Sequence, residues 1–130
     1  MKKLLCIAFL LISNASLANE SKKLNDLLDE IWSWELKHSP ILATRLGKTQ
    51  KSARLADLSP DFLNKKNQQA LSFMKKLKKI TPEKLGNSEK ISLSVQILRL
   101  QNQIDHYKYN EHFIPFTSES GFYSGLAFLP

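Results

Sequence analysis

Apolar residues recur at intervals of three and four positions through much of the chain, and this spacing predicts helices. The first clear stripe lies in residues 21–37 and consists of Leu24, Leu27, Leu28, Ile31 and Trp32. Two further stripes lie in residues 60–79 and 89–109. No segment alternates between apolar and polar residues for long enough to predict a strand. The pattern therefore predicts a mainly α fold with three long amphipathic helices and two short ones.

Proline and glycine mark the limits of the first helices. Pro40 disfavours helical geometry at the preceding residue and so ends the first helix. A short helix begins directly after it, with Ser39 as the cap and Gly47 as the stop. Ser59 followed by Pro60 is a second start signal of the same kind, and it predicts the beginning of the second long helix.

The last long helix differs from the others in the width of its apolar side. Thr81 and Pro82 predict a single short turn before it, Gly86 stops that turn, and Ser88 is the predicted helix cap. Two adjacent stripes follow, one of Leu93, Ile97, Leu100 and Ile104 and one of Ile91, Val95 and Leu98. A helix that is apolar over so wide an arc is expected to pack against more than one neighbour.

The first eighteen residues have the three parts of a secretory signal peptide. Lys2 and Lys3 supply the positive start, residues 4–12 form an apolar run of nine, and small residues lead up to Ala18. The run is too short to span a bilayer, which takes about 20 residues. We expect cleavage between Ala18 and Asn19, export to the periplasm or the medium, and no membrane anchor afterwards. The single cysteine, Cys6, leaves with the signal.

Composition limits the partners of the remaining domain, residues 19–130. Its net charge is +5 once Lys2 and Lys3 are removed from the +7 of the whole chain. The excess comes from lysine, whereas nucleic-acid sites favour arginine, of which there are only three. Apolar residues interleave with the lysine pairs of residues 65–79, which is typical of the solvated side of a helix. We therefore expect no nucleic-acid partner, and we interpret Trp32 and Trp34 as core and near-core anchors.

The end of the chain is irregular and strongly apolar. Residues 113–130 contain eight large apolar side chains among eighteen residues, and Pro115, Gly121 and Gly125 prevent one continuous helix. Such a segment must pack on other structure or drive association. Two interpretations stay open. The segment is a docked C-terminal tail, or the chain is the first part of a longer protein and self-associates through this segment when isolated.

Catalytic and metal-binding patterns are incomplete. The histidines are His38, His106 and His112, and none lies in the H-E-x-x-H spacing that places two zinc ligands on one helix face. No serine lies in a G-x-S-x-G turn. The adjacent carboxylates Asp29 and Glu30 are expected on the solvated side of the first helix. We therefore assign no catalytic residue, metal ligand or cofactor to this chain.

Several segments in order resemble a known bacterial family. They are residues 24–36 with the W-x-W core, residues 39–47 (SPILATRLG), residues 55–60 (LADLSP), residues 91–100 and residues 116–130 with Gly-Phe-Tyr. This order is similar to the N-terminal region of the family called domain of unknown function 885. The resemblance implies a largely helical, exported, zincin-like metallopeptidase whose zinc-binding H-E-x-x-H helix lies in a C-terminal half beyond these residues.

The resemblance leads to two functional hypotheses. In the first, residues 19–130 are the N-terminal helical region of an exported zinc-metallopeptidase-like hydrolase that acts on peptides, and they lack the active site. Zinc is then expected only in the other half, and Phe122 and Tyr123 are the candidates for contact with substrate. In the second, the chain is a complete small helical binding protein of the cell envelope without enzyme activity.

Overall fold

Three long helices dominate the computed structural model, which describes residues 2–48 and 55–114. They are α1 (Lys2–His38), α3 (Pro60–Leu77) and α4 (Asn87–Lys108). The short helix α2 (Pro40–Arg45) follows α1, and two single 3-10 turns, η1 (Pro82–Lys84) and η2 (Glu111–Phe113), flank α4. The described residues contain no strand, so the predicted mainly α fold is confirmed. The predicted irregular C-terminal segment lies outside the described residues from position 115 onward.

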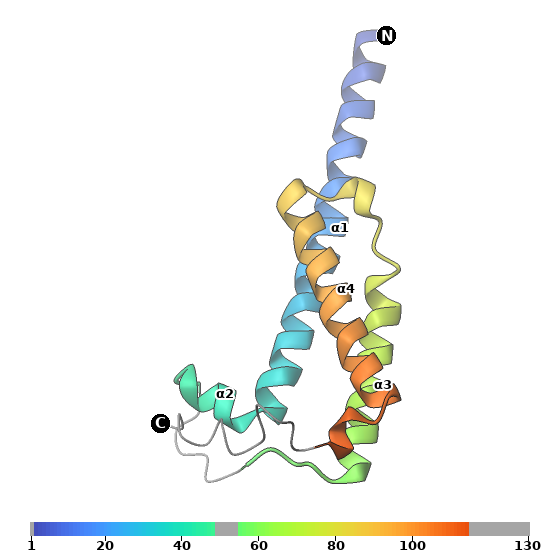
Figure 1. Cartoon of the computed structure of the whole chain (residues 1–130). Helices are drawn as coiled ribbons and strands as arrows, with labels where there is room; N and C mark the ends of the chain where they lie inside the picture. Colours follow the sequence, from blue (N-terminus) through green and yellow to red (C-terminus); the bar gives the residue numbers. More distant parts are fainter. Residues whose placement is uncertain (1, 49–54, 115–130) are drawn as a thin grey trace.

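The long helices form a bundle in which α1 and α4 run in the same direction and α3 runs against them (Figure 1). The most extensive contact between elements is that of α3 with α4. The N-terminal part of α1 extends beyond the connection between α3 and α4, with no other element beside it (Figure 1). The prediction that the first helix begins at Ser21 was wrong, because no proline or glycine interrupts the helix from Lys2 onward.

Of the predicted start and stop signals, Ser59 and Gly47 act as expected, whereas Ser39 occupies the N-cap position of α2 without a side-chain hydrogen bond. The hydroxyl of Ser59 accepts a hydrogen bond from the backbone N–H of Phe62 at 3.3 Å and caps α3. Gly47 ends the α2 segment in a left-handed conformation, with φ of 64°, which a side chain would strain.

The predicted cap of α4 was wrong by two residues. Gly86, not Ser88, is the N-cap residue, and its backbone N–H donates to the Glu89 carboxylate at 2.9 Å. This reach of Glu89 back to the cap residue is one half of a capping box, so the acid three positions after Gly86 was the informative signal.

The core lies where α1, α3 and α4 meet. Its fully buried members include Leu24 of α1 and Phe73 and Leu77 of α3. From α4, the first predicted stripe supplies Leu93 and Leu100, with Ile97 and Ile104 packed partly buried against the cluster. Trp34 also packs against it, and its ring meets that of Phe73 edge to face at 6.2 Å between centroids.

Four positions that were expected to pack lie at the surface. Trp32 is 40% exposed, so it is not the core or near-core anchor that was predicted. It is on the α1 turn that precedes Glu35, which pairs with Arg99 of α4, and this turn borders the seam between the helices rather than the core. The second stripe of α4 is also exposed, with Ile91 at 65%, Val95 at 51% and Leu98 at 60%.

Candidate functional site

The outward side of α4 is the most unusual surface among the described residues. We call the side formed by Ile91, Val95 and Leu98 the α4 face. These positions recur at i, i+4 and i+7, so they form one continuous stripe on the helix. They lie on the opposite side of α4 from Leu93 and Leu100, which are buried in the bundle. These residue types are typical of a buried helix side, but no described element covers this side of α4.

The α4 face is also almost free of charge. Among the exposed residues of α4 from Asn87 to Asn102, only Arg99 is charged. Arg99 is itself paired with Glu35 of α1 at 3.3 Å. The exposed side of α3 differs, because it carries charged residues over a similar length. These residues are Asp61, Lys65, Lys75 and Lys76. Interface centres are depleted in charge, whereas solvated helix sides are not, so the α4 face has the character of an interface.

Trp32 is an exposed aromatic residue of α1 at the same level along the bundle. The two helices run in parallel, and the pairs Ser21 with Glu89 and Glu35 with Arg99 fix their register. In that register Trp32 lies level with the residues around Leu98. Partly exposed tryptophans are enriched in protein interfaces, where this residue contributes much of the binding free energy.

A cluster of polar residues connects α1, where it enters the bundle, to the segment between α3 and α4 and to the start of α4. The buried carboxylate of Glu20 accepts hydrogen bonds from Lys23 at 2.6 Å and from the backbone N–H of Thr81 at 3.3 Å. The Lys23 hydrogen bond, and then that of Thr81, lower the pKa of Glu20. Beside it, the hydroxyl of Ser21 donates to Glu89 at 2.9 Å. Hydrogen bonds from Gly86 and then Ser21 lower the pKa of Glu89.

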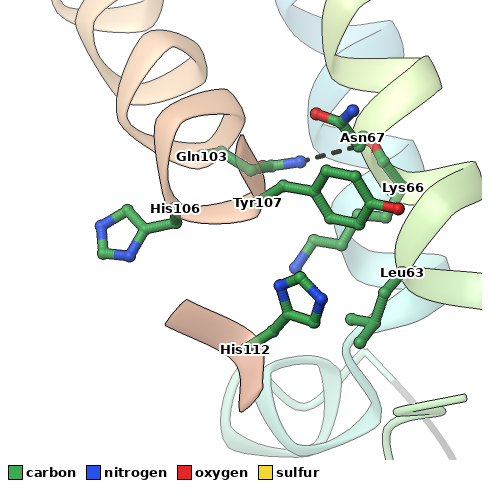
Figure 2. A pocket seen from close by; sticks show the side chains of 7 residues that line it. All are labelled: Leu63, Lys66, Asn67, Gln103, His106, Tyr107 and His112. Carbon is green, nitrogen blue, oxygen red and sulfur yellow. Dashed lines mark hydrogen bonds between the residues drawn. The ribbon is translucent and has the colours of Figure 1, made fainter. Parts of the chain in front are cut away.

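A small cavity of about 130 Å³ lies between α3, α4 and η2 (Figure 2). The α3 side supplies Leu63, Lys66 and Asn67. The other side is made by Gln103, His106 and Tyr107 of α4 and by His112 of η2.

Aromatic stacking shapes this second side of the cavity. The rings of Tyr107 and His112 stack at 5.0 Å between centroids and 7° between planes. His106 pairs with Glu111, and its ring points away from the other side chains in Figure 2. The sequence did not reveal this cavity, because its residues are spread over three elements.

The histidines do not converge on a metal site in the described part of the chain. His38 lies near the end of α1, where its Nδ1 is 2.8 Å from the carbonyl oxygen of Trp34. His106 and His112 line one cavity, but no third ligand joins them. Across residues 2–48 and 55–114, no group of three or more metal-binding side chains is present.

The predicted cleavage site lies within the described residues, and the predicted substrate positions do not. Asn19 is exposed on α1, one residue before the buried Glu20. Phe122 and Tyr123 lie outside the described residues. No described helix is long and apolar enough to cross a membrane.

Comparisons with protein-family models, with curated proteins and with solved structures each find no match to this chain.

Proposed function

We propose that this chain is an exported helical region of a zinc-metallopeptidase-like protein of the domain of unknown function 885 family. In this role it packs through the α4 face against the part that holds the zinc, and it supplies no metal ligand. The observation that carries the proposal is the charge-free apolar stripe of Ile91, Val95 and Leu98. The ordered sequence motifs supply the identity of the partner.

Burial of the α4 face contributes to the contact between two parts of a protein. Full burial of an aliphatic side chain contributes roughly 1.5–3 kcal/mol. The three residues of the face are each already partly covered, so each gains only part of this amount. Ile91, Val95 and Leu98 carry no charge. A partner that covers the face therefore incurs no desolvation penalty for a buried ion there.

Export is supported by the place where α1 joins the bundle. Glu20 and Leu24 are the first buried residues of α1 among those whose side chains are described. Cleavage after Ala18 removes only the part of the helix that projects beyond the other elements (Figure 1). The hydrogen bonds between Glu20 and Thr81 and between Ser21 and Glu89 are retained in the cleaved chain.

The same face also supports the second hypothesis, a small binding protein of the cell envelope without enzyme activity. In that case the α4 face receives a separate protein. The two hypotheses differ in what the gene encodes after the Pro130 codon.

The test joins the chain with the polypeptide encoded directly downstream. We expect an open frame that contains H-E-x-x-H, and we expect its product to be captured by the tagged chain. Val95→Glu places a charge in the interface and is expected to weaken capture by tenfold or more, whereas Ser72→Glu on the exposed side of α3 leaves it unchanged. A downstream frame without the motif contradicts the peptidase-like proposal. Equal capture by both variants contradicts the role of the α4 face.

A further inference from the structure

Two residues that line the cavity between α3, α4 and η2 each carry a covered polar atom without a hydrogen bond. Asn67 Oδ1 and His112 Nδ1 are both buried, and neither has a hydrogen-bond partner among the described residues. They come from different elements, and both residues line the same cavity (Figure 2). An unsatisfied buried polar atom is costly, so a molecule that reached these two atoms would gain two hydrogen bonds at one cavity.

The charge of the lining selects an anionic group. The ammonium of Lys66 is the charged group of the lining, His106 and His112 add ring N–H donors, and no carboxylate lines the cavity. The nearby carboxylate of Glu111 is already paired with His106. Lys66 has no ion-pair partner within the described ranges, and its side chain extends from α3 toward His112 in Figure 2.

The size and the remaining side chains of the cavity determine which molecule fits. Leu63 and the ring of Tyr107 offer apolar surface, and a cavity of about 130 Å³ has the volume of roughly four water molecules. This space suits a compact organic molecule rather than an inorganic ion. Asn67 Oδ1 accepts a hydrogen bond, so the molecule must also carry an N–H or O–H donor.

We infer that this cavity binds a small carboxylate with a neighbouring N–H donor, the chemistry of an amino acid or of the C-terminal residue of a peptide. The carboxylate pairs with the ammonium of Lys66 and accepts from His112 Nδ1 in the tautomer that carries hydrogen there. The N–H of the ligand donates to Asn67 Oδ1, and its side chain contacts Leu63 and Tyr107. Because lining side chains shield both polar atoms from water, the flexible Lys66 side chain must shift as the ligand enters.

The inference is independent of the proposed function, because it uses neither the α4 face nor the family resemblance. Four related probes separate its parts. Valine tests the free amino acid, and N-acetylvaline tests the C-terminal residue of a peptide. Valinamide lacks the carboxylate, and 3-methylbutanoate lacks the N–H donor.

Titration of the isotope-labelled chain with each probe, followed by amide chemical shifts, gives the affinities. We expect valine or N-acetylvaline to shift the amide signals of Leu63, Asn67, Tyr107 and His112. Whichever of the two binds more tightly identifies the source of the ligand. We expect valinamide and 3-methylbutanoate to bind about tenfold more weakly or worse, because each lacks one of the paired groups. Absence of shifts at these residues with both valine probes, or equal binding of valinamide, overturns the inference.

Matched variants test the assigned contacts. Lys66→Met and His112→Phe keep the apolar stem and the stacked ring but remove the groups that pair with the carboxylate. Both are expected to weaken valine binding about tenfold, with the helical circular dichroism unchanged. Lys65→Met removes an exposed ammonium from the neighbouring position and is expected to leave the affinity unchanged. If Lys66→Met and Lys65→Met bind valine equally, the site does not work as proposed.

Discussion

Two leucines on opposite sides of α4 give the sharpest test of the bundle. Leu100 is 3% exposed and belongs to the core, whereas Leu98 is 60% exposed on the α4 face. They lie two residues apart on the same helix, so substitution of each by alanine changes helix propensity equally. Any difference in the free energy of unfolding between the two variants therefore reports their packing.

The expected difference is large. Leu→Ala in a core costs about 2–5 kcal/mol, because the lost burial adds to the cost of the cavity left behind. Surface substitutions usually stay within about 0.5 kcal/mol. Leu100 packs in the cluster that contains Phe73 and Leu77, so we place Leu100→Ala within the core range. Leu98→Ala should change the free energy of unfolding by less than about 0.5 kcal/mol.

Urea unfolding followed by circular dichroism measures both values, and light scattering shows that the samples are monomeric. The reasoning is refuted if Leu98→Ala costs as much as Leu100→Ala in a monomeric sample. That result means that other parts of the chain cover the α4 face in solution.

Four further predictions concern two side-chain contacts, the zinc content and the cleavage site. Hydrogen bonds in the folded state lower the pKa of Glu89, so its stabilising contribution is present at neutral pH and is lost as the pH falls through that lowered value. Urea unfolding at several pH values should therefore show a smaller loss of stability on acidification for Glu89→Gln than for the unaltered chain. Lys76→Ala breaks the 2.7 Å ion pair with Glu30, but both side chains are half exposed, and we expect its thermal unfolding to show a loss of less than about 1 kcal/mol. Metal analysis of residues 19–130 after dialysis should find no stoichiometric zinc, and one tightly held zinc per chain contradicts the assignment of zinc to another part. The intact mass of the exported protein should begin at Asn19, and a mass that retains residues 1–18 rules out the cleavage.

The helical framework was predictable because local signals carry it. The period of Leu24, Leu27 and Ile31 and the cap formed by Ser59 depend on residues within a turn or two of each other. The cap of α4 was misplaced because Ser88 and Gly86 both suit an N-cap, and only Glu89 distinguishes them.

The candidate sites could not be predicted to the same extent, because they depend on which surfaces meet. The sequence shows two apolar stripes on α4 but not that α1 and α3 together cover only the stripe of Leu93 and Leu100. The cavity joins α3, α4 and η2, and the unpartnered atoms of Asn67 and His112 are visible only once these elements are placed. Trp32 was misjudged for the same reason, since its side of α1 borders the helix seam.

Cysteine accessibility of the α4 face in the producing cell tests the central claim most directly. In a Cys6→Ser background, Val95→Cys places a thiol on the face and Ser72→Cys places one on the exposed side of α3. We predict that a maleimide reagent labels the cysteine at position 72 but not that at position 95 in the native protein, and labels both after unfolding. Equal labelling of both positions in the native protein contradicts the claim that a partner covers the α4 face.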